Sequence, residues 1–428
     1  MANTQLHRTP SGAGNRKTFT LSFWVKRTKL STGMYLAHVG NQESNPQAGI
    51  EFNSDDTFTF WEGGVYNQKP TRKFRDVSAW YHFVIAVDTT QATEANRVKI
   101  YVNGVQETVM TTNTFPSQNA DLSWNSTQRH TIGAYYNNQS YFDGLLSHIH
   151  FIDGTAYAAS TFGSTDSTTG EWKINTAPSV TYGSNGFFIL KDGNSVTDQS
   201  GNSNNFTVAS GTLTQTEDCP SNVFATMNPV IRSSTGTFAS GNNKFTTSGG
   251  AWGSGFATLG MFNGQGKYYM EFKGASGTKI GYGISDFDNN GVIQRTEAGE
   301  NRYCGEYANS YAYHYGGNFY YSGSSTSTGY NSFTSSNVIG MAVDMDNLKI
   351  YFHKDGTYQD SKNPASNNGY TIVAPAGAYL PTICVEDAGA VANFGNGVFD
   401  TTAISSEGSN ASGIGKFEYD VPAGYTAL

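Results

Sequence analysis

A calcium-binding loop is the strongest chemical motif in this chain. The loop runs Asp286-Phe287-Asp288-Asn289-Asn290-Gly291 and is followed by Glu297. Oxygen-bearing side chains stand at positions 1, 3 and 5, with Gly at 6 and Glu at 12, a spacing that wraps six to eight oxygens around Ca²⁺. Strand and loop patterns flank the motif instead of helices, so an acidic inter-strand loop is the alternative. The candidate Ca²⁺ ligands are Asp286, Asp288, Asn290 and Glu297, and no other cofactor is expected.

Aromatic rings are the second chemical resource, because the C–H face of a sugar stacks on a flat ring. Two loop-like regions combine them with Gly, Ser and Asn, a composition that also suits adaptable protein-binding loops. For any single Tyr the alternative is a strand residue packed in a core. The candidate carbohydrate- or partner-binding residues are Trp61, Tyr66, Tyr135, Tyr136 and Tyr141 in one region and Tyr307, Tyr311, Tyr313 and Tyr315 in the other.

Catalytic motifs are missing from the sequence. It contains no G-x-S-x-G elbow, no H-E-x-x-H and no phosphate loop. His148 and His150 share one side of a strand, and we expect them on its polar face with Ile149 and Phe151 pointing into a core. Glycosidases use paired carboxylates, and sequence spacing favours no pair among the 34 acids. We therefore expect no catalytic residue and a protein that is not an enzyme, with a polysaccharide depolymerase as an alternative.

The elements that carry these residues are predicted to be β-strands. Aromatic and β-branched residues alternate with polar ones between turn signals, and no long stretch has apolar residues at helical spacing. The segments are Thr18–Val25, Thr57–Trp61, Trp80–Val87, Gly144–Ile152 and Gly186–Leu190, then Lys267–Phe272, Lys279–Ile284 and Tyr379–Val385. We predict an all-β protein of two antiparallel β-sandwiches in tandem, covering residues 1–205 and 241–428 with a connector at 206–240.

Two of these segments belong to a pattern that occurs twice. Phe83–Asp88 and Val98–Gly104 form an apolar run ending in Asp, a turn, and an alternating strand that ends in Asn-Gly. Val338–Asp344 and Leu348–Gly356 repeat it with a shorter turn and end in Asp-Gly. Each predicts a β-hairpin with a second turn at its far end. The repetition suggests one scaffold used twice with different loops.

Charge and apolar content limit the kinds of partner that the chain can bind. The net charge of −8 argues against a nucleic-acid binder, and no run is apolar enough to span a membrane. Basic residues nevertheless gather near the N-terminus, where Arg16, Lys17, Lys26 and Arg27 are candidates for docking on an acidic partner, with a solvated strand edge as the alternative. The three cysteines, Cys219, Cys304 and Cys384, are not expected to form a disulfide framework, which suggests synthesis in a reducing cytoplasm.

Short motifs in the two halves resemble known families of β-sandwich. The stretch from Phe19 to Ile152 resembles laminin-G-like, concanavalin-like jelly rolls, and residues 256 to 428 resemble SPRY domains. The first resemblance rests on Phe23–Lys26, Trp80–Phe83, Ile100–Gly104 and Phe142–Leu145, and the second on Gly266–Phe272, Val338–Gly340, Lys349–Phe352 and Asn393–Gly395. These resemblances imply two concanavalin-type sandwiches that bind carbohydrate or protein surfaces.

Three further segments resemble parts of virion proteins of tailed phages, marine ones especially. They are Asp198–Phe206 and Asp218–Pro229 at the joint, and Gly415–Tyr425 at the end. The resemblance implies a virion surface protein, either a head decoration or a tail-fibre component, that is made in the host cytoplasm and adheres to host-surface glycans. Other virion proteins would be its partners, without nucleic acid or membrane insertion. A SPRY module that joins virion components is the alternative.

Overall fold

The chain folds into two compact units, and strands make up almost all of its regular structure. The computed structural model describes residues 3–41, 47–191, 195–287, 303–327 and 329–428. One unit holds residues 1–215 and the other residues 222–428, and the stretch between them is divided between the two. Within the described residues the helices are single 3-10 turns, η1 (Glu94–Asn96), η2 (Ala159–Thr161) and η3 (Pro364–Ser366), none long enough to cross a membrane. The prediction of an all-β fold is confirmed.

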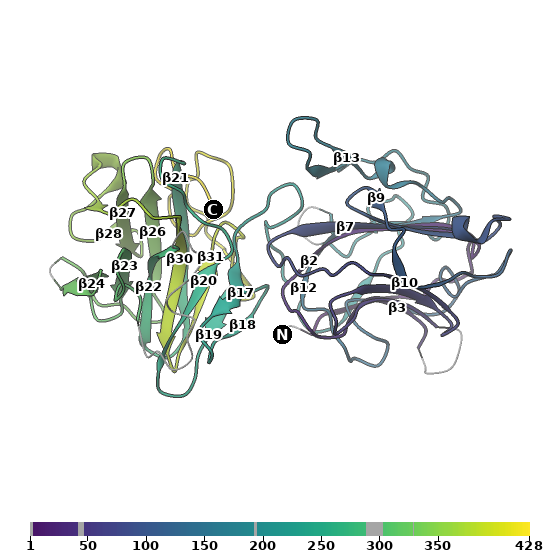
Figure 1. The fold of residues 1–428 in the computed structure, drawn as a ribbon, viewed down its shortest axis with the longest axis horizontal. Coiled ribbons are helices and arrows are strands. Elements are labelled where there is room, and N and C mark those ends of the chain that lie inside the picture. The colour runs from purple at the N-terminus through teal and green to yellow at the C-terminus, as the bar shows by residue number, and fades with distance from the viewer. Residues whose placement is uncertain (1–2, 42–46, 192–194, 288–302, 328) are drawn as a thin grey trace. The chain divides into compact units, whose positions relative to one another are not determined.

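The first unit consists of two antiparallel sheets packed face to face (Figure 1). The eight-stranded sheet has the order β10 (Met110–Thr114), β6 (Tyr66–Pro70), β5 (Phe58–Glu62), β4 (Ala48–Phe52), β3 (Met34–Val39), β11 (His130–Ile132), β1 (Gln5–Arg8), β16 (Thr207–Ser210). The six-stranded sheet has the order β15 (Phe187–Ile189), β12 (Gly144–Asp153), β2 (Thr18–Arg27), β7 (Trp80–Asp88), β8 (Val98–Val102), β9 (Val105–Gln106). The core lies between their inner faces, where Phe58 of β5 stacks on Phe83 of β7 with ring centroids 4.4 Å apart.

The outer face of the six-stranded sheet is covered by the segment 155–182. This cover includes the small hairpin β13 (Gly163–Thr165) and β14 (Trp172–Ile174). Phe162 of the cover packs with Val84 and Ile152 of the sheet. Because of the cover, polar side chains on this face are buried and need partners inside the protein.

Two histidines of the sheet form hydrogen bonds with the cover. His82 accepts a hydrogen bond at Nδ1 from Trp172 Nε1 (2.9 Å), and its Nε2 lies 2.9 Å from Ser22 Oγ. His150 stacks on Phe188 and lies 2.8 Å from the Tyr182 hydroxyl. The expected orientation of β12 is correct, since Ile149 and Phe151 join the core, but His148 and His150 are buried instead of solvated.

The second unit also has two large antiparallel sheets. Its seven-stranded sheet has the order β17 (Met227–Arg232), β20 (Trp252–Ala257), β30 (Ala378–Glu386), β22 (Lys279–Phe287), β23 (Ser310–His314), β24 (Asn318–Tyr321), β25 (Ser324–Thr326). The eight-stranded sheet has the order β18 (Thr237–Ala239), β19 (Lys244–Thr246), β31 (Gly389–Asn393), β21 (Lys267–Ser276), β26 (Val338–Asp344), β27 (Lys349–Lys354), β28 (Thr357–Tyr358), with β29 (Tyr370–Thr371) also beside β27. A separate pair is formed by β32 (Val398–Phe399) and β33 (Thr402–Ala403).

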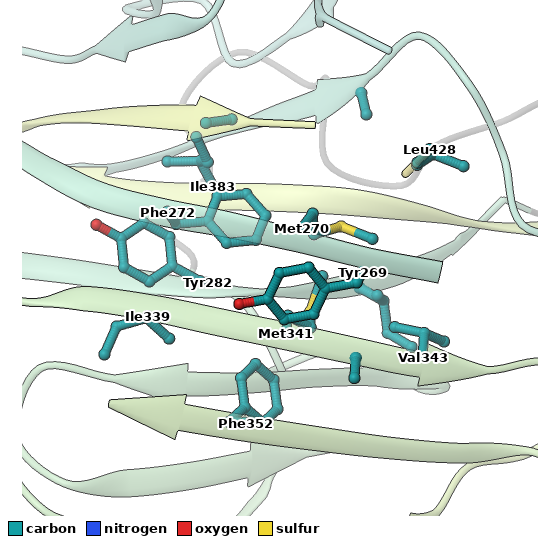
Figure 2. Close-up of a cluster of buried hydrophobic side chains, with 14 of the residues drawn as sticks. Tyr269, Met270, Phe272, Tyr282, Ile339, Met341, Val343, Phe352, Ile383 and Leu428 are labelled. Atoms are coloured by element: carbon teal, nitrogen blue, oxygen red, sulfur yellow. The ribbon is translucent and has the colours of Figure 1, made fainter. Parts of the chain in front are cut away.

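Aromatic and aliphatic side chains from both sheets fill the core of the second unit (Figure 2). Phe272 of β21 stacks on Tyr282 of β22, with ring centroids 5.0 Å apart. A buried carboxylate, Glu271, then holds the C-terminal segment by accepting hydrogen bonds from the backbone N–H groups of Glu418 (2.9 Å) and Tyr419 (2.8 Å). Chain ends stay ordered when they are tied to the core in this way.

Both repeated patterns form the predicted hairpins, but with different registers. In the first, Ile100 of β8 lies opposite Ile85 of β7. In the second, Ile350 of β27 lies opposite Val343 of β26, two residues later in the repeated motif. The longer first loop contains η1 and shifts the pairing by a whole period of the strand, so the same side chains still face the core.

The segment 206–240, predicted as a connector, contains three strands. β16 pairs with β1 at the edge of the first unit, and β17 and β18 belong to sheets of the second. The chain passes between the units at residues 215–222.

The cysteine prediction is wrong for two of the three residues. Cys304 and Cys384 form a disulfide with 5.7 Å between their Cα atoms, while Cys219 is free. They are 80 residues apart in sequence, and only the fold brings them together.

His82 gives a pH-dependent contribution to stability. Burial, together with the nearby His148, lowers its pKa to about 3. In the unfolded chain the pKa is about 6.5, so between these values unfolding takes up a proton and the stability falls as the pH falls. We expect wild-type stability to fall below pH 6.5, and to fall less steeply in His82→Gln, by up to about 1.4 kcal/mol per pH unit.

Urea unfolding from pH 7 to pH 4, followed by tryptophan fluorescence, measures this slope. His7→Gln is the comparison: burial and the charge of Arg129 also lower the pKa of the partly buried His7, but less than the pKa of His82 is lowered, so His7→Gln should change the slope less. Equal slopes in wild type and His82→Gln would contradict the prediction.

Candidate functional site

Aromatic side chains cluster on the outer face of the eight-stranded sheet of the first unit. Tyr35 and His38 come from β3, Trp61 from β5, and Tyr135 and Tyr136 from the loop after β11. The Tyr135 ring lies 4.7 Å from Tyr35, 4.6 Å from His38 and 4.6 Å from Tyr136. Trp61 contacts Tyr35 and His38 at 6.4 and 5.9 Å. All except the buried His38 are partly exposed, and the five rings are here called the aromatic face.

The backbone explains how these rings reach one another. Side chains of a strand alternate between the two faces of its sheet, and Phe58 and Phe60 of β5 point into the core. Trp61 therefore lies on the outer side, and it crosses over Gly49 of β4, its cross-strand neighbour. A Cβ atom on Gly49 would lie only 2.7 Å from the indole. The absence of a side chain there lets the indole lie flat along the sheet.

Hydrogen bonds hold the loop that carries the two tyrosines. Gln5 Nε2 donates to the Tyr135 carbonyl (3.0 Å), and Arg129 donates to the Tyr136 carbonyl (2.6 Å). The Tyr135 hydroxyl donates to Gln47 Oε1 (3.2 Å). The rings are thus positioned before any ligand arrives, which lowers the entropy cost of binding.

One carboxylate lies within the aromatic face. Glu51 is opposite Tyr35 in the pairing of β3 with β4. Burial raises the pKa of Glu51, while its hydrogen bond with the Tyr35 hydroxyl and the charge of Lys69 oppose the rise. Burial lowers the pKa of His38 to about 4, so the imidazole is neutral near pH 7. The face offers flat rings with one carboxylate, and the charges of Arg129 and Lys69 lie beside it.

Three of the five residues predicted in this region belong to the aromatic face. Tyr66 lies opposite the buried Glu62 and packs against the core instead. The backbone of Tyr141 forms an isolated β-bridge with that of Tyr35. The Tyr141 hydroxyl lies 3.4 Å from Ser210 Oγ of the edge strand β16. Tyr35, His38 and Glu51 were not among the predicted residues, although the alternation of Tyr35 with the apolar Met34 and Leu36 indicates that Tyr35 lies on the outer face.

The second predicted aromatic region is mostly core. Tyr311 and Tyr313 of β23 are buried, at 3% and 0% exposed, so they are not available to a partner. Tyr313 packs against Phe333 and Phe352. Tyr315 is partly buried against the same core, and Tyr307 is partly buried in the turn before β23. The prediction of a recognition cluster here is therefore wrong for Tyr311 and Tyr313, because both side chains of β23 point into the core.

The predicted docking residues are also divided. Arg16 and Lys17 are partly exposed, but Lys26 and Arg27 are 0% exposed and are not surface residues. Arg27 forms an ion pair with the buried Asp56 at 3.1 Å and lies 4.4 Å over the Phe52 ring. The pairing satisfies a charge that would otherwise be costly to bury.

The calcium loop falls mainly outside the described residues, since Asp288, Asn290 and Glu297 lie in the segment 288–302. Asp286 is described, and its carboxylate accepts hydrogen bonds from Asn309 Nδ2 (3.3 Å) and the Ala376 backbone N–H (3.1 Å). Elsewhere in the described chain, no three or more His, Cys, Asp or Glu side chains gather in a way that could hold a metal ion.

Family models match the chain in two places. Residues 2–161 match a laminin-G-like model described as the concanavalin A-like lectin/glucanases superfamily. Residues 266–397 match the model of the SPRY domain. The chain therefore contains a laminin-G-like, concanavalin-like domain and a SPRY domain, as its motifs predicted. No curated protein matches the chain.

Solved structures resemble single units of the protein. The SPRY domain of human HERC1 is 16% identical with a TM-score of 0.30, covering 39% of this chain and 96% of that chain. The heptameric SAP-like pentraxin of Limulus polyphemus is 15% identical with a TM-score of 0.28, covering 36% of this chain and 71% of that chain. Domain 4 of the Geobacillus stearothermophilus arabinanase AbnA, in complex with arabinotriose, is 20% identical with a TM-score of 0.27, covering 35% and 67%.

Gly49 sets the position of Trp61, which gives a stability prediction. Gly49→Ala forces a methyl group against the indole, and overpacking of this kind costs about 1–3 kcal/mol. Gly33→Ala is the control, because no atom lies within 4 Å of a Cβ placed there. Denaturant unfolding should show the loss for Gly49→Ala and a change within about 0.5 kcal/mol for Gly33→Ala. Equal stabilities would show that the indole is not held against Gly49.

Proposed function

We propose that the protein is a non-enzymatic adhesin whose concanavalin-like unit binds glycans. The aromatic face carries this proposal, because Trp61, Tyr135 and Tyr136 have partly exposed rings grouped around Tyr35 and His38. A sugar stacks its C–H face on such rings, and its hydroxyl groups donate to a carboxylate such as Glu51. The concanavalin-like match supports the same kind of ligand.

The aromatic face offers several rings on one sheet, the sheet that contains β3 and β10 in Figure 1. Several rings give a chain of sugar units more than one stacking position. Each such site is weak by itself, and display of many copies makes weak sites effective.

We further propose that the adhesin serves a tailed-phage virion, as a head decoration or a tail-fibre component that faces host-surface glycans. The support is the resemblance of Asp198–Phe206, Asp218–Pro229 and Gly415–Tyr425 to parts of such proteins. The SPRY domain favours a second role, in which the second unit joins the protein to other virion proteins. Arg16 and Lys17 are partly exposed and remain candidates for contact with the particle.

The glycan proposal predicts the effect of removing Trp61. Trp61→Ala should weaken binding to the glycans that the wild type selects on a printed array by about tenfold or more, the usual effect of losing a central aromatic anchor. Val65→Ser is the control, because Val65 is 64% exposed and outside the aromatic face. Unchanged binding by Trp61→Ala, or release of reducing sugar from the bound polysaccharide, would contradict a non-enzymatic site on this face.

The virion proposal predicts that purified particles contain the protein at many copies. Mass spectrometry of the particles should detect it, and cross-linking should join Lys residues of the second unit to another virion protein. Absence from purified particles would remove the virion role and leave the glycan proposal standing.

A further inference from the structure

A short segment of the second unit lies on the outer face of its seven-stranded sheet. Residues 303–309 precede β23, and Cys304 is bonded there to Cys384 of β30. His314 Nε2 donates to the Cys304 carbonyl at 2.9 Å, and the Gly323 backbone N–H donates to the Gly305 carbonyl at 2.9 Å. We call residues 303–309 the strap. It is fastened to three strands or their ends.

Small residues beneath the strap let it approach the sheet. Ser254, Cys384 and Gly281 lie opposite one another on β20, β30 and β22. A Cβ atom on Gly281 would come within 2.8 Å of His314, and one on Gly305 would come within 2.5 Å of Tyr320. Both cysteines are buried as a result. The position of Cys304 in turn determines where its neighbour Tyr303 lies.

That residue, Tyr303, completes a second group of aromatic rings. Its ring lies 6.1 Å from Trp252 of β20, 4.8 Å from Tyr320 of β24 and 5.3 Å from His314. His314 is buried beneath the group, while Trp252, Tyr303 and Tyr320 are partly exposed. The strap thus places the Tyr303 ring next to Trp252 and Tyr320, which belong to strands of the sheet.

Charged groups next to these rings offer a donor and an acceptor side by side. Glu386 is the cross-strand neighbour of Trp252, and Lys279 Nζ lies 2.6 Å from the Glu386 carboxylate. A sugar hydroxyl both donates and accepts hydrogen bonds, so it matches a carboxylate beside an ammonium group. The charge of Glu306 acts on Tyr303, and that of Asp387 acts on Lys279. Together with Glu386 these carboxylates outnumber the Lys279 ammonium group, which disfavours an anionic sugar.

We propose that Trp252, Tyr303 and Tyr320 form a second carbohydrate-binding face, selective for neutral sugars, that is complete only while the Cys304–Cys384 bond is present. The bond acts by holding Tyr303 between the other two rings. This face is in the SPRY-type unit and does not depend on the aromatic face of the first unit, so either can fail without the other.

The test uses the full-length protein on a printed array of neutral, sialylated and sulfated oligosaccharides. Trp252→Ala and Tyr303→Ala should weaken binding to one set of neutral glycans by about tenfold or more. Trp61→Ala should leave that set bound. Phe262→Ala is the matched control, because it removes a ring that is 55% exposed elsewhere on the same unit.

The double variant C304S/C384S tests the fastening. It should bind the glycans that depend on Trp252 and Tyr303 about tenfold more weakly, and it should keep the binding that depends on Trp61. If the double variant fails to fold, Tyr303→Ala still tests the face, because it leaves the disulfide intact. The proposal is overturned if no glycan depends on Trp252 and Tyr303, if the dependent glycans are anionic, or if a folded C304S/C384S binds like the wild type. Dependence on Trp252 that is seen only on a peptide array would assign the face to protein recognition and also overturn it.

Discussion

The alternation of side chains along each strand is the constraint on which the rest of this protein depends. It sends one set of residues into a core and the other set to an outer face, and what happens to each outer face then differs. In the first unit, one outer face is sealed by the segment 155–182, and the other keeps Trp61, Tyr135 and Tyr136 at its surface. In the second unit, the strap covers part of one outer face and leaves rings around it. The cores make the two units alike, and the treatment of the outer faces makes them different.

The local patterns were sufficient to predict the strands and the hairpins, because those depend on neighbouring residues. The pairs Phe83–Asp88 with Val98–Val102 and Val338–Asp344 with Lys349–Lys354 form as their sequences indicate. Their different registers could not be predicted, since register depends on loop length and on the opposing sheet. The same applies to the disulfide between Cys304 and Cys384, which are 80 residues apart, because their approach depends on the pairing of β22 with both β23 and β30.

Candidate site residues were harder to predict, because a period of two indicates that residues share a face but not which face. Tyr311 and Tyr313 alternate on β23 and Tyr315 follows the end of that strand, and this spacing suits an exposed set as well as a buried one. Two of the three are almost fully buried, where their rings contribute to the core. On β5, Phe58 and Phe60 point into the core and Trp61 points outward. The orientation of the Trp61 ring then depends on Gly49 of the neighbouring strand. A sequence shows no such neighbour across a strand.

The low charge content of the chain follows from how its loops are satisfied. Asp198 accepts hydrogen bonds from the backbone N–H groups of Phe188, Ser200 and Asn204, and the Asn204 amide donates to the carbonyls of Ser184 and Gly186. Asx turns and amide donors of this kind satisfy buried backbone groups without ion pairs. Few charged residues are therefore needed in these loops. A neutral, hydroxyl-rich ligand costs less to desolvate than a strongly charged one, so it suits partly exposed rings such as Trp61 and Trp252.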